Sequence, residues 1–227
     1  MMVEILLVRH GETVFNVQSR IQGMANSELT PAGVDMAQAL GRGMRLAGVR
    51  VAAAYSSDLT RAFDTANYAL AAAGNALTVH KRPGLREENY GKYEGEPTTA
   101  LTQGVFHLPT LAAVMARYSL IDLANLTNAA NRDQTPNEAE TALQVAARFD
   151  TTMREIAETA AAADQARVLV VAHGASILLW LAAIGFDIGN LTAVGNASVT
   201  TLTYDQATFH VQDFNSLAWV HAGMTAK

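Results

Sequence analysis

The chain has 227 residues, of which 50% are hydrophobic and 16% charged, and its formal net charge is −5 at pH 7. This length suffices for one large domain, and the acidic balance argues against a nucleic-acid partner. Cysteine is absent, which excludes disulfides, a thiol nucleophile and a thiolate metal site. The start of the chain lacks the features of a signal peptide, and no apolar run reaches the ~20 residues of a membrane span. We therefore expect a soluble, cytoplasmic protein with no membrane partner.

Short runs rich in aliphatic and β-branched residues predict the strands of the first part of the chain: Val3–Val8, Val49–Tyr55 and Thr78–His80. Two amphipathic segments with helix start and stop residues separate them. The first follows Thr30, which can cap it; a proline comes next, and Gly48 lies past its end. The second is expected to be capped by Ser57 or Asp58 and to end near Ala73.

From Asn137 onward, apolar residues recur at three- and four-residue spacing, which predicts a long helix. A strand at Val168–Ala172 and a helix at Ser176–Ile184 follow. Two alternating runs around a polar turn, within Ser198–Asn215, predict a β-hairpin. Strands that alternate with helices indicate an α/β fold: a three-layer sandwich with a mainly parallel central sheet flanked by helices.

The segment Pro97–Pro136 interrupts this alternation with apolar clusters and an internal proline. We interpret it as a mostly helical insertion over the active site rather than an independent domain, so residues 1–227 are expected to form a single domain. Its apolar residues suggest a partly apolar lid that sets the substrate: Leu101, Val105, Phe106 and Leu108. The same residues could instead simply pack on the body of the domain.

Two of the predicted strands end in a His-Gly pair, at His10 and at His173. Ligands of open parallel sheets bind outside the carboxyl ends of the strands, and glycine allows a close approach of the backbone. Arg9 precedes the first histidine, and Arg61 lies about one turn into the helix after the second strand. Each feature alone has an ordinary structural explanation. Together they predict a cationic pocket for a phosphoryl group. Neither histidine has a carboxylate or third histidine at ligand spacing, so no metal site is predicted.

Acid–base chemistry at such a pocket also needs a carboxylate. The segment PGLREENYGKYEGEPT, which begins at Pro83, offers four candidates: Glu87, Glu88, Glu94 and Glu96. Its glycines and aromatic residues predict an ordered loop, but spacing alone does not choose among the four.

Five motifs occur in order: LLVRHGETVFN, RIQGMANSELTPAG, YSSDLTRAFDTA, LREENYGKYEG and VVAHGASI, with a weaker match at GNASVTTL. Together they resemble the histidine phosphatase superfamily, the group that includes the cofactor-dependent phosphoglycerate mutases. The resemblance spans about Val3–Thr203, and the insertion is its least family-like part. Two smaller departures are Asn26, where relatives often have aspartate, and Ala172, where serine is frequent.

The resemblance implies a role for each matching residue. His10 would be the nucleophile that becomes a phosphohistidine, and Glu87 would protonate the leaving oxygen. Three residues would hold the phosphoryl oxygens: Arg9, Arg61 and His173. Three more match positions that line the phosphate or substrate pocket: Asn16, Gln22 and Gly23. No metal or other cofactor is implied.

Phosphoryl transfer needs in-line positioning and compensation of negative charge, which arginine and histidine supply. Histidine attacks only as the neutral imidazole, so its other ring nitrogen should be tied to an acceptor. A carbonyl in the turn at Gly11 is the expected partner of His10. Since the acid must be protonated while the nucleophile is neutral, we expect a mildly acidic pH optimum.

The segment REENYGKYEG is closer to the phosphatase pattern than to the mutase segment NERHYG. The insertion contains Arg117 and Arg132 but lacks the adjacent arginine pair of the mutases. We therefore favour hydrolysis of a small phosphorylated metabolite. A phosphoglycerate mutase and a non-catalytic phospho-ligand sensor are the alternatives. The sequence leaves open which phosphomonoester is the substrate and whether the protein is a homo-oligomer.

Overall fold

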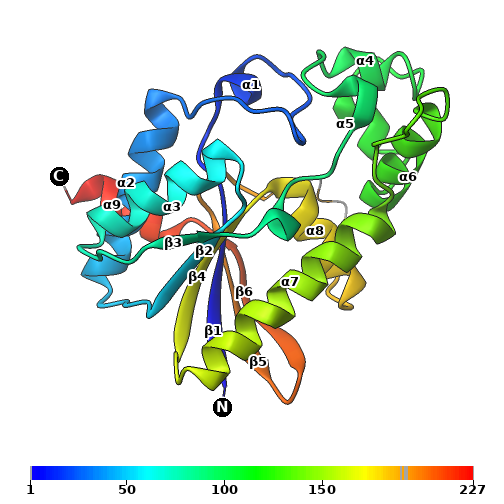
Figure 1. Ribbon diagram of the computed structural model, residues 1–227. Helices are drawn as coiled ribbons and strands as arrows, with labels where there is room; N and C mark the ends of the chain where they lie inside the picture. The colour runs from blue at the N-terminus through cyan, green and yellow to red at the C-terminus, as the bar shows by residue number, and fades with distance from the viewer. Residues whose placement is uncertain (1, 190, 192–193, 227) are drawn as a thin grey trace.

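A computed structural model describes residues 2–189, 191 and 194–226, which contain one central sheet (Figure 1). Its strands are β1 (Val3–Arg9), β2 (Ala53–Ser56), β3 (Val79–Lys81), β4 (Arg167–Ala172), β5 (Val199–Asp205) and β6 (Thr208–Ser216). They lie in the order β3-β2-β4-β1-β5-β6. The pairings among β3, β2, β4 and β1 are parallel, whereas the β1–β5 and β5–β6 pairings are antiparallel. The predicted mainly parallel sheet and the C-terminal hairpin are confirmed.

Helices cover both faces of the sheet and complete a three-layer sandwich (Figure 1). They are α1 (Val14–Val17), α2 (Pro31–Leu46), α3 (Thr60–Ala72), α4 (Thr99–Thr102), α5 (Leu111–Met115), α6 (Leu120–Ala130), α7 (Ala142–Ala162), α8 (Gly174–Ala183) and α9 (Ala218–Thr225). Because alternate strand residues point to opposite faces, Leu6 packs in one core cluster with Leu40 of α2, and Ile5 packs in the other with Phe149 of α7. Among the described residues, no helix combines the length and apolar character needed to cross a membrane.

The helices α4, α5 and α6 lie within the predicted insertion and gather beyond one end of the sheet (Figure 1). They share a third, smaller apolar cluster with a residue of the N-terminal region: Ile21, Leu101, Phe106, Val114 and Leu123. We call α4–α6 the lid. The lid therefore packs on itself and on the loop that contains Ile21, and its helix α6 also joins the main core cluster of the domain through Leu120 and Ala124.

Two predictions at the start of the second βα unit are wrong. The strand begins later than Val49, because the Val49 N–H bonds back to the Met44 carbonyl near the end of α2 (2.9 Å). Helix α3 has no side-chain cap, so neither Ser57 nor Asp58 caps it. The Asp58 carboxylate instead pairs with Arg86 at 2.5 Å, which ties this turn to the loop after β3.

Two further differences concern the start of one helix and the presence of another. Helix α7 begins after Thr141 and not at Asn137, because Thr141 and Gln144 form a reciprocal capping box. The C-terminal helix α9 was not predicted from the sequence. It packs on α2, where Arg42 Nε donates to the Gly223 carbonyl at 2.8 Å. The sequence did not predict this helix because its eight residues are too few to show a clear amphipathic period.

Candidate active site

The two His-Gly pairs lie side by side because β1 and β4 are neighbours in the sheet. Arg9 is in register with Ala172, and the His10 N–H donates to the Ala172 carbonyl at 3.0 Å. The centroids of the His10 and His173 rings are 5.2 Å apart. Both side chains are buried, with exposed fractions of 3% and 0%. The sheet thus brings together the two histidines that the sequence placed at separate strand ends.

The tautomer of His10 is fixed by its own turn. Its Nδ1 lies 2.7 Å from the Gly11 carbonyl oxygen, and since a carbonyl only accepts, Nδ1 carries the proton. The other nitrogen, Nε2, is then an unprotonated electron-pair donor. Burial lowers the pKa of His10 well below its usual value, and the Arg61 and Arg9 charges lower it further. The imidazole is therefore neutral at physiological pH, as nucleophilic attack requires.

Arg61 is fully buried on α3 and is held by the loop that precedes α2. Its two terminal nitrogens donate to the Gly23 carbonyl at 2.7 Å and the Ala25 carbonyl at 3.0 Å. Burial lowers the pKa of Arg61 to about 10, so it still carries its charge at neutral pH. Arg9 donates to the Val194 carbonyl, and burial lowers its pKa as well. Both guanidinium groups are fixed by hydrogen bonds to backbone carbonyls, which leave their positive charges available to an anion.

Several buried N–H and ring nitrogens near the two histidines have no hydrogen-bond partner among the described residues. They are Arg9 Nε, Gln22 Nε2, Arg61 Nε and both ring nitrogens of His173. Buried polar groups are nearly always satisfied, so such a concentration indicates a place where a ligand completes the network. Burial lowers the pKa of His173 well below its usual value, and the nearby Arg61, Arg148 and Arg9 charges lower it further, so these cations lie within electrostatic reach of the His173 ring.

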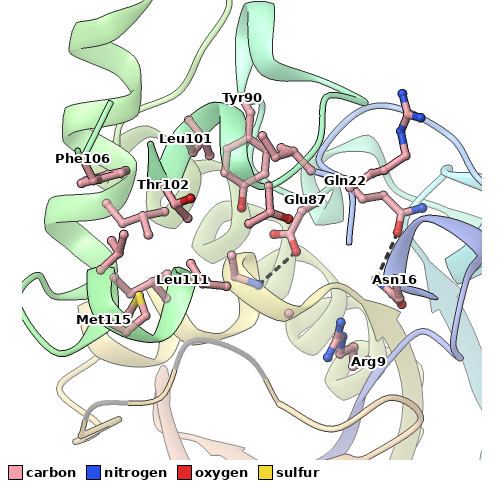
Figure 2. A pocket seen from close by; sticks show the side chains of 18 residues that line it. Arg9, Asn16, Gln22, Glu87, Tyr90, Leu101, Thr102, Phe106, Leu111 and Met115 are labelled. Atoms are coloured by element: carbon pink, nitrogen blue, oxygen red, sulfur yellow. Dashed lines mark hydrogen bonds between the residues drawn. The ribbon is translucent and has the colours of Figure 1, made fainter. Parts of the chain in front are cut away.

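Among the four candidate carboxylates, Glu87 lies at the N-terminus of the helix that follows His173. Its oxygens accept from the N–H groups of Ala175 (3.0 Å), Ser176 (2.6 Å) and Glu88 (3.0 Å). Figure 2 shows Glu87 pointing into a cavity that Arg9 also lines. This position, at a helix N-terminus and beside the cationic cluster, distinguishes it from the other three.

The other glutamates of the loop serve different purposes. Glu94 accepts hydrogen bonds from the N–H groups of Gly23, Met24 and Ala25 at 2.8–3.2 Å, which holds the loop that binds Arg61. Glu88 is fully buried, and neither of its oxygens has a partner within the described part of the chain. Burial raises the pKa of Glu88 well above its usual value, and the neighbouring Glu87 charge adds to that. Glu96 is exposed.

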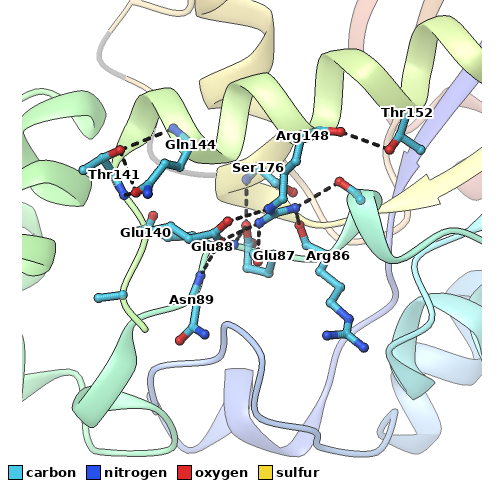
Figure 3. Close-up of polar contacts among 12 residues, drawn as sticks. Arg86, Glu87, Glu88, Asn89, Glu140, Thr141, Gln144, Arg148, Thr152 and Ser176 are labelled. Atoms are coloured by element: carbon cyan, nitrogen blue, oxygen red, sulfur yellow. Dashed lines mark hydrogen bonds and ion pairs between the residues drawn. The ribbon is translucent and has the colours of Figure 1, made fainter. Parts of the chain in front are cut away.

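Arg148 of α7 clamps the loop that contains Glu87, as Figure 3 shows. Its guanidinium donates to the carbonyls of Gly84 (3.0 Å), Arg86 (2.7 Å) and Glu87 (2.8 Å). The same group forms a two-point ion pair with Glu140, at 2.7 and 2.8 Å. The Glu140 carboxylate also accepts from the Asn89 N–H at 3.0 Å. We call Arg148 and Glu140 the clamp; sequence analysis missed it, because both residues look like ordinary surface charges on a helix.

The remaining predicted residues fall into two groups. Asn16 and Gln22 line the cavity, and the Gln22 Oε1 accepts from Thr13 Oγ1 at 2.7 Å and Asn16 Nδ2 at 3.4 Å. Gly23 does not line it. Its carbonyl holds Arg61, and a Cβ there would lie 2.0 Å from the Glu88 carbonyl oxygen, so glycine is required by close packing.

Asn196 also contacts the site, and the sequence indicated it only through the weak motif match GNASVTTL. Its Nδ2 lies 3.1 Å from the His10 carbonyl and 3.3 Å from Asn16 Oδ1. It therefore joins the His10 turn to α1. His10, Arg61 and His173 do not themselves line the cavity, whereas their chain neighbours Arg9 and Gly174 do. Within the described ranges, no group of three or more His, Asp or Glu side chains is arranged to hold a metal ion.

Comparisons with known proteins agree on one family. The family model described as histidine phosphatase superfamily (branch 1) matches residues 5–217. The crystal structure of a phosphoglycerate mutase from Bacillus anthracis (strain Sterne) has a TM-score of 0.88 and 30% identity, and covers 98% of this chain and 97% of that one. A mycobacterial glucosyl-3-phosphoglycerate phosphatase, solved with VO3, has a TM-score of 0.70 and 26% identity, over 94% of this chain and 99% of that one.

Sequence comparison also finds "Probable phosphoglycerate mutase GpmB" of Yersinia pestis (strain Pestoides F), which is 41% identical over 101 residues. The match covers 44% of this chain and 45% of that relative. It thus spans less than half of either protein. The names of these similar proteins include both mutases and phosphatases, so the specific reaction has to be argued from the site.

Proposed function

Because the chain belongs to branch 1 of the histidine phosphatase superfamily, we propose that it hydrolyses a small phosphomonoester through a phosphohistidine on His10. The observation that supports this most is the cluster of buried, unpartnered nitrogens around the two histidines. A phosphoryl group offers several oxygens to such donors and a negative charge to Arg9 and Arg61.

In the first step, His10 Nε2 attacks the phosphorus atom, and the bond between phosphorus and the ester oxygen breaks. The Nδ1–H bond to the Gly11 carbonyl stabilises the positive charge that the ring acquires. Arg9, Arg61 and His173 bind the phosphoryl oxygens. Glu87, as the carboxylic acid, gives its proton to the leaving oxygen, so the products are an alcohol and phosphohistidine.

In the second step, a water molecule attacks the phosphohistidine. The Glu87 carboxylate takes a proton from that water, the nitrogen–phosphorus bond breaks, and inorganic phosphate leaves. Glu87 is thereby protonated again and His10 is neutral, which restores the starting state. The hydrogen bonds from Ala175 and Ser176 hold the carboxylate in place through both steps.

A phosphoglycerate mutase is the second candidate, because similar proteins carry that name. A mutase must also bind the carboxylate of its substrate with further cations. Of the lid arginines, Arg117 lies over the Tyr118 ring, 5.6 Å from its centroid, and does not line the cavity, and Arg132 donates to the Ala129 carbonyl at 2.9 Å. Neither is placed for a substrate carboxylate, which favours hydrolysis.

The test is phosphate release from a panel of phosphomonoesters, with a chelator present, by the wild-type chain and His10→Ala. The panel contains an aryl phosphate, sugar phosphates, nucleotides and both monophosphoglycerates. We expect release by the wild type and a loss of at least about a thousandfold in the variant. Interconversion of phosphoglycerates by enzyme primed with a bisphosphate would support the mutase instead. Ligand binding without turnover in either assay would indicate a phospho-ligand sensor.

A further inference from the structure

The cavity beside Glu87 has two chemically different ends (Figure 2). One end contains Arg9, Asn16, Gln22 and Glu87, the polar groups discussed above. The other end is formed by the lid, and its lining side chains are mostly apolar: Leu101, Phe106, Leu111, Val114, Met115 and Leu123. We call this second end the apolar compartment. It adjoins the proposed phosphate site, so it is where the remainder of a bound ester would lie.

Some side chains that line the apolar compartment are not buried in the lid's own apolar cluster. Leu101, Phe106 and Val114 are buried in the lid cluster, as expected of a small core. By contrast, Leu111 lines the cavity while 43% exposed, and Met115 next to it on the same helix is only partly buried. When an apolar ligand covers apolar surface that faces a cavity and is accessible to water, the removal of that surface from water favours binding.

Among the described residues, the lid contributes no charged side chain to the cavity lining, so the apolar compartment itself holds no partner for a second anionic group. Arg20 is the one cation besides Arg9 that lines the cavity; it is exposed, its Nε donates to the Gly95 carbonyl at 2.6 Å, and its guanidinium lies 5.2 Å from the Phe15 ring. Lys92, near the base of the lid, pairs with Asp133 at 2.7 Å. The compartment thus suits an uncharged group.

The lid end of the cavity also contains a buried hydroxyl without a partner in the described part of the chain. The Thr102 hydroxyl is buried and has no hydrogen-bond partner among the described residues, and Thr102 lines the cavity (Figure 2). A fully apolar ligand would leave it unsatisfied, whereas a single hydroxyl, ether or carbonyl oxygen would satisfy it. Tyr90 and Thr98 also line the cavity, and the Thr98 hydroxyl already donates to the Ser19 carbonyl at 2.6 Å.

We propose that the substrate is the phosphomonoester of an apolar alcohol or phenol, whose alkyl or aryl group occupies the apolar compartment and is covered by Leu111 and Met115. The inference rests on the proposed hydrolysis at His10 and names the substrate class of that site. It disfavours phosphoglycerates and sugar phosphates, whose hydroxyl and carboxylate groups would lose hydration without finding partners there.

The test compares kcat/KM for primary n-alkyl phosphates from ethyl to octyl, which share nearly the same leaving-group chemistry, with glycerol phosphate as the polar counterpart of propyl phosphate. Each methylene that enters the compartment should raise kcat/KM about fourfold, until the compartment is filled. Leu111→Asn and Met115→Gln should flatten this dependence. Leu126→Asn is the matched control, because Leu126 of α6 is 40% exposed and does not line the cavity.

Binding of non-hydrolysable n-alkyl phosphonates, measured by calorimetry, separates this inference from the proposed function. Affinity that rises with chain length in an inactive protein would support the compartment and contradict the hydrolysis. Efficient, His10-dependent hydrolysis with no dependence on chain length would contradict the compartment and leave the hydrolysis intact. Preference for glycerol phosphate over propyl phosphate would also overturn the inference.

Discussion

The carboxylate of Glu87 accepts a hydrogen bond of 2.6 Å from the backbone N–H of Ser176, a residue 89 positions away in the sequence. Ser176 lies in the first turn of α8, directly after His173. The helix that follows one histidine therefore positions the candidate acid beside both. Because the contact uses a backbone donor, it depends on the fold of α8 and not on a particular side chain at position 176.

Replacing the acid should affect poor leaving groups most. Glu87→Gln keeps the size of the side chain but cannot donate a proton to an alkoxide. We expect kcat/KM for an alkyl phosphate, which reports the step that releases the alcohol, to fall by about 10²–10⁴, and kcat/KM for p-nitrophenyl phosphate, whose leaving group needs no proton, to fall far less. Steady-state kinetics on both esters measure this. An equal loss on both would contradict the role of acid and indicate a merely structural carboxylate.

The clamp should act on the same step through Glu87. Arg148→Lys keeps a charge but loses the three carbonyl contacts and the two-point pair with Glu140, so the loop before Glu87 is held less firmly. We expect kcat/KM to fall roughly tenfold to a hundredfold, again more for alkyl than for aryl phosphates.

A double-variant cycle checks this prediction. If the clamp works by positioning Glu87, Arg148→Lys should add little in a Glu87→Gln background. Arg154→Lys is the matched control, because Arg154 lies on the same helix and pairs with Asp150 at 2.7 Å, away from the loop. Fully additive losses in the cycle would show that Arg148 acts independently of the acid.

The buried charges also set the protonation of the histidine pair. Burial lowers the pKa of His10 and of His173, and Arg61 lowers each further. Arg61→Met removes a nearby cation, so protonation of either imidazole becomes less unfavourable. The pKa values of His10 and His173 should therefore both rise. Activity requires neutral His10, so the loss of kcat/KM on the acid side should move to higher pH. NMR titration of the imidazoles measures the shift, with Arg20→Met as control; an unchanged titration would refute the coupling.

The buried Glu88 should make the free energy of unfolding depend on pH. Its pKa is raised in the folded state, so the folded protein holds a proton that the unfolded chain releases above its ordinary pKa of about 4.3. The carboxyl group therefore destabilises the fold increasingly as pH rises, until the folded pKa is reached. Glu88→Gln removes this term and should stabilise the protein by about 1.4 kcal/mol more for each pH unit in that window.

Denaturant unfolding at pH 5 and pH 8 measures this difference. Glu138→Gln is the control, because Glu138 is exposed. A stability change for Glu88→Gln that is the same at both pH values would contradict a buried, protonated Glu88. If Glu88→Gln instead lowered the stability only at high pH, the folded protein would hold Glu88 as a stabilising ionised carboxylate.

Much of the sheet and of the histidine site follows from the sequence, because both depend on patterns that are local in the chain. Apolar runs such as Val3–Val8 predict buried strands, and parallel order then places residues such as His10 and His173 at one edge. The motifs also carry Arg9 and Arg61 at fixed spacing from those strands. The pairing of His10 Nδ1 with the Gly11 carbonyl is local too, and the structure contains it.

The family resemblance implied Glu87 as the acid, but only the tertiary structure showed why this carboxylate lies at the site, how its loop is held and what surrounds the rest of the cavity. Four glutamates within ten positions look alike in sequence, and only Glu87 meets the N-terminus of α8. Arg148 contacts carbonyls 61 to 64 positions away. Such contacts form only when distant segments pack together, and backbone donors and acceptors carry no residue-type pattern, so no local feature of the sequence encodes them.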